Sequence, residues 1–131
     1  MKTFEEVWSF VARTRSGEVV SPELRPLVLR VHMDATTTPV DLPALKSSVV
    51  ALLQYLSGQG RTNANCWAAD LFFGSDDLDH VWSEQELPDD FHDLLAMMGE
   101  ALHDTVSSPE IAENFGCLPE QLLKCAERLE I

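Results

Sequence analysis

The sequence predicts an all-α fold: a compact single-domain bundle of six or seven short helices over residues 1–131, with orthogonal or irregular packing. Apolar residues recur at spacings of three and four along most of the chain, which is the period of a helix. Capping residues and prolines precede these stretches, and glycines follow several of them. The length of 131 residues and the 45% hydrophobic content suit one domain with one core.

Two helices are predicted before residue 36. A T-x-x-E capping box at residues 3–6 begins the first, and Gly17 ends it. Ser21, followed by a proline, indicates the start of the second. Residues 26–33 leave a choice, because they alternate like a strand as well as carrying a helical stripe. We favour the helix, because no second strand is available to pair with this segment.

The next two predicted helices have clear boundaries. After a loop at residues 36–39, Asp41 can cap a helix with the most regular apolar stripe in the chain, and Gly58 ends it. Thr62 can cap the following helix, which covers roughly residues 63–73.

The C-terminal half is predicted to begin with a short turn or helix at residues 75–82. Three further helices are predicted to begin at Pro88, Pro109 and Pro119. The first of them reaches about Asp104, and Gly116 ends the second.

The helix at residues 63–73 is apolar on all sides, which is typical of a central, buried helix. Asp70 on this helix therefore needs a partner, and Arg61 is one candidate. Cys66 lies in Cys66-Trp67-Ala68, which follows Gln59-Gly60 and locally resembles the region around the nucleophile of papain-like proteases. That resemblance implies a thiol of lowered pKa near a helix N-terminus, but the family also uses a histidine on a sheet, and no sheet is predicted. We interpret Cys66 as a small buried apolar residue.

The charge distribution is the most informative functional feature. Residues 62–123 contain no Lys or Arg but fourteen carboxylates, so the charge of this segment is −14. Residues 1–61 sum to +1 and residues 124–131 to zero, which gives the net charge of −13. Local ion pairs cannot neutralise such a segment, so most of it must face water, a cation or a basic partner. A salt-adapted source is an alternative explanation of the low Lys content.

The helix at residues 89–104 separates its charges from its apolar residues. Phe91, Leu94, Leu95, Met98 and Leu102 form one face. Asp89, Asp93, Glu100 and Asp104 lie opposite, within about 60° at roughly 100° per residue. No Lys or Arg at a spacing of four relieves the repulsion among these acids, which favours a binding role for the face.

We therefore predict a non-enzymatic, acidic protein-binding module, best described as a bacterial immunity or antitoxin type of inhibitor that neutralises a basic partner such as a toxin or nuclease. Trp82 is the predicted anchor within the acidic segment. The predicted partner-binding residues are Asp76, Asp77, Asp79, Trp82, Glu84, Glu86, Asp89, Asp93, Glu100 and Asp104. The sequence leaves open which protein is bound and how many copies of the chain associate.

The alternative function is a metal-dependent hydrolase. His92-Asp93 and His103-Asp104 place two His-Asp pairs eleven residues apart, on one side of a helix. The pairs resemble the doublet of the helical HD phosphohydrolases, which implies His92, Asp93, His103 and Asp104 as metal ligands. The surrounding lack of Lys and Arg is unsuited to a phosphate substrate, so the preferred interpretation has no catalytic residue, metal or other cofactor.

Several classes are disfavoured by composition. The negative charge opposes binding to nucleic acid and to anionic membranes. Three cysteines without a C-x-x-C pair argue against a disulfide framework and fit a reducing compartment. The acidic N-terminal residues do not resemble a signal peptide, and no apolar run is long enough to span a bilayer, so a cytoplasmic protein is expected.

Overall fold

The computed structural model describes residues 4–11, 20–37, 39–73, 87–116 and 118–130. Its helices are α1 (Phe4–Val11), α2 (Leu24–Thr36), α3 (Leu42–Ser57), α4 (Asn63–Phe73), α6 (Asp89–Ser107), α7 (Pro109–Asn114) and α8 (Pro119–Glu127). The described residues contain no strand, so the predicted all-α bundle of short helices is confirmed. The expected end of the first helix at Gly17 and the expected turn at 75–82 lie outside the described residues.

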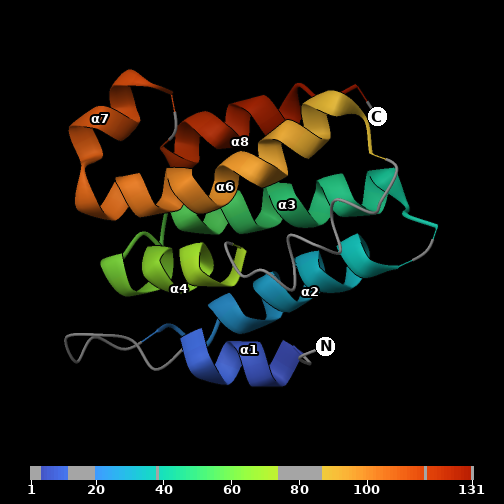
Figure 1. Cartoon of the computed structure of the whole chain (residues 1–131), viewed down its shortest axis with the longest axis horizontal. Helices are drawn as coiled ribbons and strands as arrows, with labels where there is room; N and C mark the ends of the chain where they lie inside the picture. The colour runs from blue at the N-terminus through green and yellow to red at the C-terminus, as the bar shows by residue number, and fades with distance from the viewer. Residues whose placement is uncertain (1–3, 12–19, 38, 74–86, 117, 131) are drawn as a thin grey trace.

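The helices stack in layers (Figure 1). Helices α3 and α6 lie between α8 on one side and α2 and α4 on the other, and α1 covers α2 and α4. The most extensive pairings are α4 with α6, α3 with α8 and α2 with α3. Short helix α7 packs against the C-terminal part of α6.

The apolar stripe of α3 supplies the centre of the core, as its sequence predicts. Leu45, Val49, Leu52, Leu53 and Leu56 are all fully buried. The cap of this helix is also as predicted, because the Asp41 carboxylate accepts a hydrogen bond from the Ala44 amide at 3.1 Å.

Residues 26–33 are helical, which resolves the choice between helix and strand. Pro26 is tolerated because it is the third residue of α2, where its missing N–H would have had no acceptor within the helix. The helix continues to Thr36 rather than ending before it as predicted. The hydroxyls of Thr36 and Thr37 donate to the carbonyls of His32 and Met33 at 2.8 and 2.6 Å, which satisfies acceptors of the last turn.

An aromatic cluster joins α1 to the rest of the molecule. The Phe4 ring lies 5.9 Å from Trp8, 5.3 Å from Phe72 and 5.5 Å from the His32 imidazole. Burial in this cluster lowers the pKa of His32. The imidazole therefore packs as a mostly apolar ring near neutral pH.

Asn65 connects the turn before α2 to the turn between α3 and α4. Its side chain is fully buried, and its Oδ1 accepts from the Ser21 amide at 2.9 Å. Its Nδ2 donates to the Gly60 carbonyl at 2.9 Å and to the Ser21 hydroxyl at 3.1 Å. Gly60 has no room for a side chain, because an added Cβ would lie 2.1 Å from the Tyr55 ring. The adjacent cap is as predicted, with Thr62 accepting from the Asn65 amide at 3.1 Å.

Replacing Asn65 by Ala should lower the free energy of unfolding by about 2–4 kcal/mol, because the Ser21 amide and the Gly60 carbonyl lose a buried partner. Urea denaturation followed by circular dichroism measures this loss. Asn63→Ala is the matched control, since Asn63 is exposed at the start of the same helix and should change stability by under about 0.5 kcal/mol. Equal effects of the two changes would contradict the role given to Asn65.

Candidate functional site

The structure divides the predicted partner-binding residues into two groups. Asp76, Asp77, Asp79, Trp82, Glu84 and Glu86 lie outside the described residues. The other four belong to α6. Asp89 and Asp93 are exposed and Asp104 is half-buried, whereas the side chain of Glu100 is not among those described.

The core face of α6 is as predicted. Its five apolar residues, Phe91, Leu94, Leu95, Met98 and Leu102, are at most 5% exposed. This buried face fixes the rotation of the helix, and the acids opposite it are consequently directed outward.

The N-terminal part of α6 presents a trio of exposed carboxylates, Asp89, Asp90 and Asp93. Within the described part of the chain, no ion pair involves any of the three. Asp89 and Asp90 are in the first turn, where the helix dipole partly offsets their mutual repulsion. Asp93 lies beyond that turn and receives less of this stabilisation. Asp90 is not among the predicted partner-binding residues, because it lies to one side of the acidic column, which is the row formed by Asp89, Asp93, Glu100 and Asp104 along the helix.

The acids of the column differ in their exposure to solvent along α6. Asp104 is half-buried, and its charge contributes to raising the pKa of Asp70 on α4. Only the first half of the column therefore forms an open acidic surface among the described residues.

Asp70 has a different partner from the one predicted. Its Oδ2 lies 3.4 Å from the Nδ1 of His103 on α6, and its side chain is 14% exposed against 50% for His103. Burial raises the pKa of the Asp70 carboxyl, and the nearby imidazole partly opposes this rise. The ring centroid of Trp67 lies 5.1 Å from that of His103, edge to face. The predicted pairing with Arg61 is wrong, because α4 turns Asp70 towards α6.

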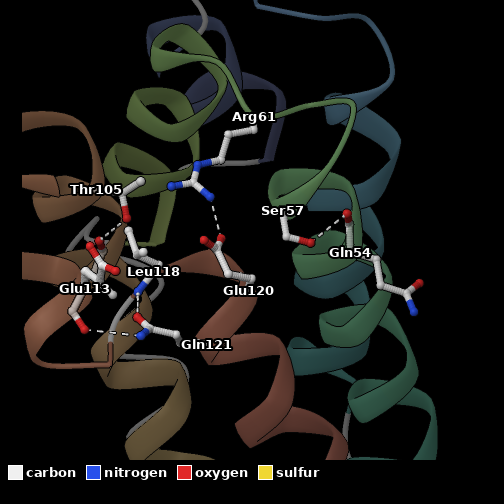
Figure 2. Close-up of polar contacts among 9 residues, drawn as sticks. Gln54, Ser57, Arg61, Thr105, Glu113, Leu118, Glu120 and Gln121 are labelled. Carbon is white, nitrogen blue, oxygen red and sulfur yellow. Dashed lines mark hydrogen bonds and ion pairs between the residues drawn. The ribbon is translucent and has the colours of Figure 1, made fainter. Parts of the chain in front are cut away.

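Arg61 instead pairs with Glu120 of α8, as Figure 2 shows. Arg61 lies in the turn between α3 and α4, so this contact joins that turn to the first turn of α8. Nearby, Gln121 accepts from the Leu118 amide at 2.9 Å and donates to the Glu113 carbonyl at 3.2 Å (Figure 2). The last cation before the acidic segment thus neutralises one of its fourteen carboxylates.

The two His-Asp pairs do not converge. His92 and His103 are separated by eleven residues of continuous helix, or roughly 16 Å along its axis, whereas metal–nitrogen bonds are about 2 Å long. His92 is exposed, and His103 faces Asp70 rather than a second histidine. Among the described residues, no three His, Cys, Asp or Glu side chains form a group able to hold a metal ion.

Cys66 is buried, as the interpretation of it as a structural residue requires. It is 2% exposed, and burial raises its pKa to about 11, although the positive charge of Arg61 partly opposes the shift. The lowered pKa implied by the resemblance to papain-like proteases is therefore wrong for this thiol. Cys125, on α8, is exposed.

Comparisons of the chain with protein-family models, with curated proteins and with solved structures find no match. None of the described helices is both long enough and apolar enough to cross a membrane. The case for a function consequently depends on the charges and contacts of the chain itself.

The contact between Asp70 and His103 predicts a pH-dependent stability. His103→Ala should lower the free energy of unfolding at pH 7 by about 1 kcal/mol, because Asp70 keeps its burial and loses its partner. A carboxyl whose pKa is raised in the folded state stabilises the fold below its unfolded pKa, and this contribution is lost as the pH rises through the folded pKa. The cost of His103→Ala should therefore decrease once the pH falls below the folded pKa of Asp70, because the protonated carboxyl no longer depends on the imidazole.

Urea denaturation at several pH values tests this expectation. His92→Ala is the control, because His92 is an exposed histidine on the same helix. A pH-independent cost of His103→Ala, or an equal cost for both variants, would argue against the contact.

The cysteines should differ in reactivity. In a Cys117→Ser background, a thiol reagent such as DTNB at pH 8 should modify Cys125 at least a hundredfold faster than Cys66, because Cys66 is buried and protonated. In 6 M urea both thiols should react at similar rates. Similar rates in the native protein would contradict the burial of Cys66.

Proposed function

We propose that this protein is an acidic binding protein of the immunity or antitoxin type, which neutralises a basic partner protein. The observation that supports it best is the trio of Asp89, Asp90 and Asp93, which is exposed and has no ion-pair partner among the described residues. The trio belongs to a 62-residue segment without any Lys or Arg.

Electrostatics explains how such a surface would act. Three like charges within two turns of a helix repel one another, and a basic partner relieves this repulsion on contact. At physiological salt the Debye length is about 8 Å, so the attraction acts only when the partner is already near, where it orients the partner and accelerates association. Association should then be fast and sensitive to salt.

The position of the trio suits recognition of a folded protein. The buried side of the same helix, including Phe91, Leu94 and Leu95, holds the backbone in place. The backbone that carries the carboxylates consequently needs little ordering when a partner binds, which reduces the entropic cost of association. Trp82 stays the predicted anchor within the adjoining segment.

Reversing the charge of the trio should remove partner capture. We expect the immobilised protein, exposed to a lysate of its source organism at 50 mM salt, to retain a basic protein in stoichiometric amount and release it at 1 M salt. The variant Asp89→Lys, Asp90→Lys, Asp93→Lys should retain at least tenfold less of that protein, as quantified by mass spectrometry. Both baits must show the same helical circular dichroism.

A matched control separates the trio from net charge in general. Glu23→Lys, Glu110→Lys, Glu113→Lys reverses three other exposed acids and changes the net charge by the same amount. Glu110 lies in the first turn of α7, as Asp89 and Asp90 do in α6, so the control includes a loss of dipole stabilisation as well. Retention equal to the natural chain in both variants, or an equal loss in both, would refute the proposed surface.

A further inference from the structure

A groove lies between the beginning of α6 and the end of α8, which are neighbours in Figure 1. Its volume is about 610 Å³, within the range of about 300–1,000 Å³ that accommodates ligands or side chains of a partner. From the side of α6 it is lined by Pro88, Asp90 and Leu94. From the side of α8 and the residues after it, the lining comes from Cys125, Arg128, Leu129 and Glu130.

The apolar part of the groove continues the core. Leu94 is 5% exposed and belongs to the core, while Leu129 is half-buried and packs against it. Lys46 donates from α3 to the Leu129 carbonyl at 2.8 Å, which holds this side of the groove in position. A bulky apolar side chain entering between Leu94 and Leu129 would extend packing that already exists.

The charged part of the groove is asymmetric. Asp90 lines the side of α6, and the exposed Asp89 and Asp93 flank it on the same helix. The opposite side carries Arg128 together with Glu130. A cation is therefore favoured on the side of α6, which contributes only carboxylates, over the opposite side, where the charge of Arg128 offsets that of Glu130.

We propose that this groove receives a bulky apolar side chain of the basic partner, with a neighbouring Lys or Arg directed at the carboxylates that begin α6. The inference rests on the proposed function and names the part of the partner that is recognised. The groove adjoins the acidic trio, so one short segment of the partner can place an apolar side chain in the groove and a basic side chain on the trio.

Two short peptides test the groove without the natural partner. We expect acetyl-Lys-Trp-Lys-amide to produce saturable amide shifts in ¹⁵N NMR at residues 90, 94 and 125–130, with a dissociation constant near millimolar. Acetyl-Glu-Trp-Glu-amide should bind at least fivefold more weakly at 50 mM salt, and the difference should shrink at 0.5 M.

Two pairs of variants assign the effect to the groove. Cys125→Trp fills the groove and should abolish the shifts, whereas Glu127→Trp adds the same side chain to the same helix outside the lining and should preserve them. Arg128→Glu changes only an exposed side chain and should tighten binding of the basic peptide at least threefold, which provides a test even if Cys125→Trp does not fold.

Absent shifts, equal binding of the two peptides, or peptide binding retained by Cys125→Trp would overturn the inference. Shifts of the groove amides that depend on protein concentration without peptide would show that a second copy of the chain occupies it, which also overturns the inference. Partner capture that is lost on reversing the trio but kept by a folded Cys125→Trp would remove the groove while leaving the proposed function. Peptide binding at the groove combined with unchanged partner capture by the reversed trio would refute the proposed function while leaving the groove as a binding site.

Discussion

The buried amide of Asn65 is the contact on which the arrangement of the helices depends. It bonds to both the backbone and the hydroxyl of Ser21 and to the carbonyl of Gly60, so the beginnings of α2 and α4 and the end of α3 meet at one point. Because the side chain is fully buried, water cannot replace these bonds if the turns move apart. Helix α1 then packs on α2 and α4, α8 packs on α3, and α6 packs on α4.

The acidic surface is a consequence of that packing. Helix α4 is short and mostly buried, and α6 lies along it with its apolar face inward. The contact between Asp70 and His103, with Trp67 against the imidazole, occurs at the outer edge of this interface. Beyond it, the beginning of α6 extends past α4 towards α8, where its carboxylates meet solvent and the groove.

Like charges remain close together at this surface. Few ion pairs among the described residues offset the negative charges of the chain, whose net charge is −13, and the chief ones are Arg61 with Glu120 and Arg25 with Glu5. Exposed ion pairs of this kind contribute at most about 1 kcal/mol each, so the stability must come from the apolar core. On the proposed function, the remaining repulsion is a property of the free protein that a basic partner removes.

The sequence by itself determined the helices and the direction of their faces. The stripes of α3 and α6, the caps at Asp41 and Thr62, and the separation of acids from apolar residues on α6 are local properties, set by the helical period and by capping chemistry. The tertiary structure decided which side chains meet. It paired Asp70 with His103 rather than Arg61, kept His92 apart from His103, and brought residues 88–94 beside residues 125–130 to form the groove. The physical reason is that these contacts depend on how far each helix is displaced and rotated against its neighbours, which is settled by the packing of the whole core and by the buried bonds of Asn65.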